Sequence, residues 1–269
     1  PYVGSAAFAH KAGLHTSAIR RRADAYEHID PNEVGNGSRV VVSELSGRST
    51  LELKAAELGL ELDPEGSGEV LDTLKRLEHA GYHFEVADGS LELLLRAAAG
   101  EPQGGTEGLF RIESFRVTTD WRAHHGGFAG DSAAPRRLVH PWAEDGTLLT
   151  EATVKVHVGG ERIVATAEGN GPVHALDAAL RQAVGRAFPE LASVRLTDYR
   201  VRVIDTSSGT GAVTRVLVDT ADADGSWSTI GVSENVIEAS WEALVDSLEY
   251  GMRVSGRTAG EAAKSVRRS

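Results

Sequence analysis

Two stretches of the sequence decide the architecture: AEGNGPVHALDAALRQAV at residues 167–184 and GVSENVIEASWEALVDSL at residues 231–248. They align at an offset of 64 residues, so that Val173 matches Ile237 and Ala175 matches Ala239. Each stretch follows an expected strand and opens an expected helix. We therefore predict two strand–strand–strand–helix units, each too small to bury its own sheet face without a partner.

The residues around these stretches alternate between apolar and polar side chains, as half-buried strands do. From Leu109 onward the alternation predicts strands near residues 109–121, 153–158, 162–167, 196–205, 213–219 and 226–232. Gly159-Gly160 is a hairpin signal between two of them. We expect helices over 172–188 and from Ser233 to about Val254.

Apolar residues at helical spacing predict three more helices upstream, in residues 46–60 and 65–81 and from Asp88. The fold class is therefore α+β, with small, mainly helical subdomains before the two β-β-β-α units. We expect a first linker subdomain over residues 1–43 and a helical linker subdomain over 44–104. A domain that holds both units follows over 105–254, and a disordered tail over 255–269.

Composition excludes several classes of function. The chain has 269 residues, 28 Lys and Arg against 39 Asp and Glu, and no cysteine. A net charge of −11 argues against nucleic acid as a partner. No apolar run reaches the ~18 residues of a membrane helix, and no signal peptide opens the chain, so we expect a cytoplasmic protein. Because the chain begins with Pro1 in the middle of a pattern, we expect a fragment of a longer protein.

Two groups of residues could carry chemistry. His10, His15 and Tyr26 are suited to proton transfer near neutral pH, although the residue types alone favour ordinary surface or core positions. The histidines are five residues apart, which suits no common metal site. Small residues open the helices after Gly169 and Ser233, where free N–H groups favour a carboxylate. Simple capping explains both loops without a ligand.

Long blocks of the sequence resemble one family of enzymes. Residues 2–49, YVGSAAFAHKAGLHTSAIRRRADAYEHIDPNEVGNGSRVVVSELSGRS, resemble the segment after the catalytic barrel of the 2-isopropylmalate, homocitrate and citramalate synthases. EATVKVHVGG, AEGNGPVHALDAAL, LTDYRVRVID and WSTIGVSENVIEASWEALVDSLEYG resemble the regulatory, dimer-forming domain of that family. With YEHIDP upstream, the resemblance is closer to the (R)-citramalate synthase branch than to the leucine-pathway branch.

The resemblance implies an acyltransferase that condenses acetyl-CoA with a 2-keto acid, pyruvate in the citramalate branch. The family's divalent metal and keto-acid pocket sit on a TIM barrel of about 250 residues. Neither its HxHND motif nor eight βα units occur in this sequence. We therefore expect no cofactor in this chain, a metal in the missing barrel, and no activity from this fragment alone.

The resemblance also implies roles for single residues. His15 matches the catalytic histidine that reaches over the barrel, Tyr26 matches the tyrosine that assists it, and His10 matches a position of less defined role. Family enzymes place these residues over the partner's barrel, which implies a homodimer with a lid-like first subdomain.

The regulatory half implies a feedback site for a branched-chain amino acid, isoleucine in the citramalate branch or leucine in the other. The matching positions are Gly171, Val173, Leu196, Tyr199, Val203 and Ala212. Plain sheet–helix core is the alternative interpretation of these six. The alternatives for the whole chain are a free-standing amino-acid-binding or dimerisation module without catalysis, or the equivalent part of a 2-isopropylmalate synthase.

Overall fold

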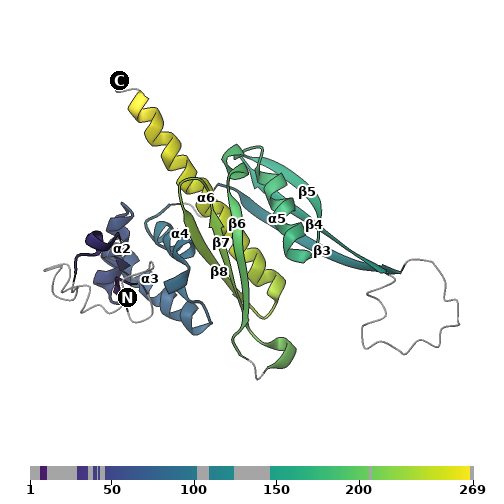
Figure 1. Ribbon diagram of the computed structural model, residues 1–269, viewed down its shortest axis with the longest axis horizontal. Coiled ribbons are helices and arrows are strands. Elements are labelled where there is room, and N and C mark those ends of the chain that lie inside the picture. Colours follow the sequence, from purple (N-terminus) through teal and green to yellow (C-terminus); the bar gives the residue numbers. More distant parts are fainter. Residues whose placement is uncertain are drawn as a thin grey trace. The chain divides into compact units, whose positions relative to one another are not determined.

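The computed structural model describes residues 7–10, 29–35, 39–40, 42, 46–101, 109–123, 146–205 and 208–266. The chain divides into two compact units (Figure 1). Unit 1 comprises Pro1–Leu109 and Glu190–Ser269, and unit 2 comprises Phe110–Pro189. This grouping differs from the expected boundaries, because the expected domain over 105–254 is divided and the helical linker joins its second half.

Unit 2 is the first strand–strand–strand–helix unit. Its elements are β3 (Arg111–Ala123), β4 (Gly146–Val158), β5 (Glu161–Gly169) and α5 (Pro172–Val184). The strands form an antiparallel sheet in the order β3-β4-β5. Alternate β4 side chains such as Val154 and Val156 are buried. Gly159 and Gly160 turn the chain with positive φ, which confirms the expected hairpin.

The second strand–strand–strand–helix unit lies within unit 1. It contains β6 (Arg195–Val203), β7 (Thr214–Ala221), β8 (Ser226–Ser233) and α6 (Val236–Val266). The sheet order is β6-β7-β8, again antiparallel. The 64-residue offset holds in the strand register, since Lys155 opposite Val164 corresponds to Asp219 opposite Ser228. The predicted repeat and the α+β fold class are therefore confirmed.

Three helices precede the second sheet in unit 1: α2 (Arg48–Glu57), α3 (Pro64–His79) and α4 (Asp88–Ala98). Asp63 caps α3 by accepting the Gly66 N–H at 2.6 Å, and Gly59 ends α2 with a φ of 71°. Their apolar faces form one core with a residue of β8: Val42, Leu51, Ala55, Leu60, Val70, Leu74, Phe84, Ala87, Leu91, Leu95 and Ile230. The three helices therefore pack against the second sheet as well as against each other.

The two sheets differ on the face that these helices use. Leu217 and Val232 pack against the helical core beside Ile230. At the offset of 64, their counterparts in unit 2 are Thr153, Glu168 and Thr166, which are polar. Thr153 and Thr166 pair their hydroxyls at 2.9 Å on an exposed surface. The sequence difference between the repeats thus explains which sheet face takes the helical core, because only the face with Leu217, Ile230 and Val232 offers apolar area to bury.

Several short elements complete the described chain. β1 (Ala9–His10) pairs in parallel with β2 (Arg39–Val40). Asp30 caps a short 3-10 helix by accepting the Asn32 N–H at 2.9 Å. The 3-10 helices are η2 (Pro31–Val34), η3 (Phe84–Val86), η5 (Pro189–Ala192) and η6 (Gly209–Gly211).

The C-terminal helix is longer than the sequence suggested. α6 continues past Val254 to Val266, into the region expected to be a disordered tail. Apolar spacing after Gly13 predicts a short helix, and the Gly-rich residues 124–137 predict a loop. Both segments lie outside the described residues. In the described part of the chain, no helix is both long and apolar enough to cross a membrane.

Gly231 fixes the distance between β8 and α6, which gives a first prediction. A Cβ at Gly231 would collide with the carbonyl oxygen of Ala239. We expect Gly231→Ala to lower the free energy of unfolding by about 1–3 kcal/mol, because backbone atoms must move apart. Urea denaturation measures the change. Gly225→Ala is the control, since its Cβ meets no atom within 4 Å, and equal effects of the two substitutions would contradict the close-packing argument.

Candidate functional site

The predicted catalytic residues cannot be placed. His15 and Tyr26 lie outside the described residues, and for His10 only the strand position in β1 is described. Their roles stay predictions from the resemblance.

Gly171 and Val173 stand at the start of α5, as predicted. Gly171 is the residue before the helix, has an extended backbone, and supplies no side chain to cap it. The equivalent start of α6 is capped, because the Asn235 side chain accepts the Ile237 N–H at 2.9 Å. Ser233 accepts the Asn235 N–H and donates to Glu238. Capping therefore accounts for the start of α6 but leaves the first-turn N–H groups of α5 without a side-chain cap.

Four predicted effector residues belong to unit 1 and lie on or after β6. Tyr199 is half-buried, and its hydroxyl bonds to the Ser240 hydroxyl of α6 at 2.7 Å. Leu196 and Val203 are exposed, and Ala212 is buried after η6. Tyr199 thus contributes to the packing of strand on helix, while Val203 lies on the surface of the edge strand.

The six effector positions are divided between the two units. Gly171 and Val173 belong to unit 2, and the other four belong to unit 1. Each unit is defined by its own internal contacts, so the assembly of all six into one pocket stays a prediction.

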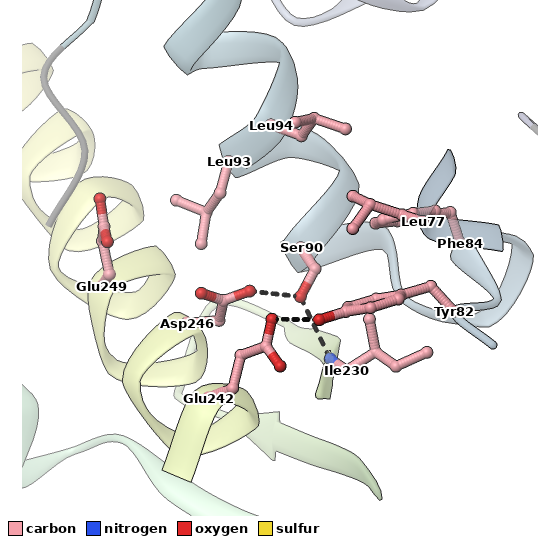
Figure 2. A pocket seen from close by; sticks show the side chains of 10 residues that line it. All are labelled: Leu77, Tyr82, Phe84, Ser90, Leu93, Leu94, Ile230, Glu242, Asp246 and Glu249. Atoms are coloured by element: carbon pink, nitrogen blue, oxygen red, sulfur yellow. Dashed lines mark hydrogen bonds between the residues drawn. The ribbon is translucent and has the colours of Figure 1, made fainter. Parts of the chain in front are cut away.

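A pocket that the sequence did not indicate lies in unit 1, where α4 packs against β8 and α6 (Figure 2). Its volume is about 230 Å³. It is lined by Leu77, Tyr82, Phe84, Ser90, Leu93, Leu94, Ile230, Glu242, Asp246 and Glu249. The three acids come from α6 at helical spacing and face a wall of apolar and aromatic side chains, in which Tyr82 and Phe84 are stacked.

The outer edge of β8 is closed by side chains at this pocket. Asp88 accepts the Ser228 N–H at 2.9 Å, and Ser90 accepts the Ile230 N–H at 3.1 Å. Farther along the strand, Glu242 accepts the Val232 N–H at 3.1 Å. An edge strand must satisfy its free donors when it is covered, and here α4 and α6 supply the acceptors.

Two carboxyl groups of α6 also accept hydrogen bonds from the helical segment, residues 46–101, which precedes the sheet in unit 1. The Tyr82 hydroxyl donates to Glu242 at 2.5 Å, and the Ser90 hydroxyl donates to Asp246 at 2.6 Å (Figure 2). Burial raises the pKa of Asp246 to about 7, and the negative charges of Glu242 and Glu249 add to the rise while Ser90 opposes it. Burial and the Glu242 carboxylate raise the pKa of Tyr82, and burial raises the pKa of Glu242. Asp246 therefore changes charge near neutral pH.

A second polar cluster joins α4 to α6 beside the pocket. Glu92 accepts hydrogen bonds from Arg96 at 2.7 Å and from the Tyr250 hydroxyl at 2.9 Å. Glu101 then bridges Arg96 and Arg253, at 2.9 and 3.0 Å. These contacts hold α4 and α6 together through charge-assisted hydrogen bonds, which are the stronger kind.

Because Asp246 joins α6 to Ser90 of α4 and has a pKa of about 7, the contact between these two helices can respond to protonation. In the described part of the chain, no group of three or more His, Cys, Asp or Glu residues could hold a metal ion. The sequence signal that was missed is the acidic series Glu242, Asp246 and Glu249, which recurs at helical spacing on one face of α6.

Comparison with known proteins gives two family matches. Residues 142–252 match the LeuA allosteric (dimerisation) domain, and residues 2–81 match the homocitrate synthase post-HMGL domain-like family.

Relatives that match nearly the whole of this chain are named as citramalate or 2-isopropylmalate synthases. The chain is 49% identical over 258 residues to an (R)-citramalate synthase of Streptomyces coelicolor and 45% identical over 256 residues to one of Synechocystis. A probable 2-isopropylmalate synthase of Methanopyrus kandleri is 32% identical over 247 residues. These matches cover 95, 94 and 91% of this chain but only 44, 43 and 43% of the relatives. The chain therefore spans less than half the length of these relatives.

The pKa of Asp246 predicts a pH dependence of stability. Because its pKa is raised in the folded state, the native protein keeps a proton that the unfolded chain releases near pH 4. The stability that comes from this proton is complete below about pH 4 and is lost as the pH rises through 7. Relative to Asp246→Asn, which stays neutral, the parent chain should lose roughly 1–3 kcal/mol between pH 5 and 8.

Urea denaturation at several pH values measures this difference. The control is Asp72→Asn, because Asp72 is an exposed carboxylate on α3. Its curve should run parallel to that of the parent chain. Parallel curves for the parent and Asp246→Asn would show that Asp246 does not titrate in this range.

Proposed function

Since the chain belongs to the citramalate synthase and 2-isopropylmalate synthase family, we propose that it is the C-terminal portion of an acyltransferase that makes citramalate from acetyl-CoA and pyruvate. The observation that carries the proposal is the match of nearly the whole chain to relatives named (R)-citramalate synthase. In this chemistry an enol or enolate of the acetyl group attacks the keto carbon, and the thioester is then hydrolysed.

The proposal gives this chain the lid of the active site. His15 would move a proton of the acetyl methyl group, and Tyr26 would assist it over the barrel of a partner subunit. A base close to the methyl group in a site closed to water suits this step. The divalent metal belongs to the missing barrel, the described residues offer it no site, and no step on this chain depends on it. Cytoplasmic localisation stays a prediction.

The second half of the chain would sense an end product, isoleucine in the citramalate branch. The uncapped start of α5 at Gly171 supports this, because free N–H groups at a helix N-terminus favour a carboxylate. Exposed aliphatic residues on β6, including Leu196 and Val203, supply the apolar surface that a branched side chain needs. The match to a dimerisation domain supports a homodimer.

An alternative is the equivalent part of a 2-isopropylmalate synthase, which the Methanopyrus kandleri relative favours, with leucine as effector. A free-standing binding module is a further alternative. The choice of amino acid separates the first two readings, because isoleucine and leucine are isomers that differ in where the side chain branches, and an apolar pocket shaped for one packs the other less well.

Calorimetric titration tests the effector site. We expect isoleucine to bind more tightly than leucine or valine. Val203→Asp should weaken binding at least tenfold, because it places a negative charge in an apolar site that also takes a carboxylate. Leu148→Asp is the control, since Leu148 is also an exposed aliphatic residue and lies outside the predicted set. No binding of any of the three amino acids at millimolar concentration would refute the effector site.

The fragment alone should release no CoA from acetyl-CoA and pyruvate, because the barrel that holds the substrates is missing. A thiol-reactive dye measures free CoA, and the chain has no cysteine to react with it. The full-length parent enzyme is the positive control. Turnover by the fragment would place the active site within these residues, contrary to the proposal.

A further inference from the structure

The internal repeat gives each half of the chain an equivalent groove between its last strand and its helix. In unit 1 this groove lies between β8 and α6, and α4 occupies it. Gly89 packs directly on Trp227, Ser228 and Thr229 of β8. Asp88 and Ser90 accept the outward N–H groups of Ser228 and Ile230.

Unit 2 has the same strand edge, and none of the described residues of this unit occupies it. The two ladders share one register at the offset of 64, and each packs a helix on the equivalent side. Strand stereochemistry therefore directs the N–H groups of Val164 and Thr166 outward, as it does those of Ser228 and Ile230. Both residues are exposed, and among the described residues no side chain accepts either N–H group.

A cavity of about 480 Å³ lies beside this edge, entirely within unit 2. Ile163, Val164 and Ala165 of β5 form one wall, and Gln182, Ala183 and Arg186 at the end of α5 belong to the other. The groove is thus lined by both apolar and polar side chains.

The residues that differ between the two grooves indicate the charge of the occupant. In unit 1, Tyr250 donates to Glu92 of α4, and at the offset of 64 its counterpart in unit 2 is Arg186. Arg186 is exposed and has no ionic partner among the described residues. The neighbouring Arg162 is already paired with Glu113 at 2.6 Å. Arg186 therefore leaves an unmatched positive charge where α4 would present a carboxylate.

We propose that the groove between β5 and α5 is a docking site for an acidic amphipathic helix of a partner protein segment, bound as α4 is bound in unit 1. Its first turn carries acceptors for the N–H groups of Val164 and Thr166, and a carboxylate one turn later pairs with Arg186. A second copy of this chain does not readily supply the helix, because its own α4 is buried in its own unit 1.

A peptide with the α4 sequence, residues 86–101, is the probe. Labelled at its N-terminus, it should bind the full chain in a fluorescence anisotropy titration. Arg186→Glu should weaken binding at least tenfold, and Val164→Pro should also weaken it, because proline removes an edge N–H group and is tolerated on an edge strand. Arg116→Glu is the matched control, an exposed arginine on β3 of the same unit, and should leave the affinity unchanged.

A charge exchange makes the test specific. A peptide in which Glu92 is replaced by Lys should bind the Arg186→Glu variant at least tenfold better than it binds the parent chain. Circular dichroism verifies that each variant is folded.

Three results would overturn the proposal. The first is no binding at millimolar peptide. The second is binding that responds to Tyr250→Phe but not to Arg186→Glu, which would mean that the peptide displaces α4 in unit 1. The third is a change of oligomeric state in sedimentation on Arg186→Glu, with no change in peptide affinity, which would assign the groove to an interface between copies.

Discussion

The edge of β8 is the constraint on which unit 1 depends. A strand covered by helices has no water to satisfy its outward N–H groups, so each group needs an acceptor from a neighbouring side chain. Asp88 and Ser90 supply two of these from α4, and Glu242 supplies the third from α6. Ile230 then lies in the helical core, and the Ser90 hydroxyl also donates to Asp246, which joins α4 to α6. Loss of these acceptors would affect the helical segment and the second sheet together.

The contact of α4 with β8 and α6 connects the two functions proposed for the chain. The residues assigned to the lid precede the helical segment, and part of the proposed effector site is on β6 in the sheet to which that segment is attached. Tyr199 ties β6 to α6 through Ser240. α6 in turn meets α4 through the Ser90–Asp246 and Tyr250–Glu92 contacts. A displacement of α6 therefore has a continuous route of packed groups to α4.

Much of this architecture could be predicted from the sequence, because local patterns determine it. The offset of 64 residues predicts the two units, and Gly159-Gly160 predicts a turn that has positive φ in the structure. The strand registers of the two sheets keep the same offset. Which elements pack against each surface could not be predicted in this way. The periodicity around Ile230 shows that one face is apolar, but not that α2, α3 and α4 cover it.

Parts of the candidate sites could likewise be predicted from the sequence, and other parts could not. Tyr199 was identified only through the resemblance to the family, since an apolar strand face is common in cores. The helix start at Gly171 was indicated by its small residues, but capping explained it equally well without the resemblance. The pocket lined by Ser90 and Asp246 was missed because those two residues are 156 positions apart in the sequence. Acids at helical spacing usually describe a solvated face, and only the three-dimensional contact with α4 shows otherwise.

The division of unit 1 into two segments has a consequence for the order of assembly. Unit 2 is continuous in sequence, so all its contacts can form as soon as Pro189 has been made. The helices of unit 1 must wait for β8 and α6, because the contacts between Asp88 and Ser228 span 140 positions. Contacts of such long range slow folding. During synthesis on the ribosome the helices α2, α3 and α4 therefore remain without their sheet while unit 2 folds, and their apolar faces stay exposed in that interval.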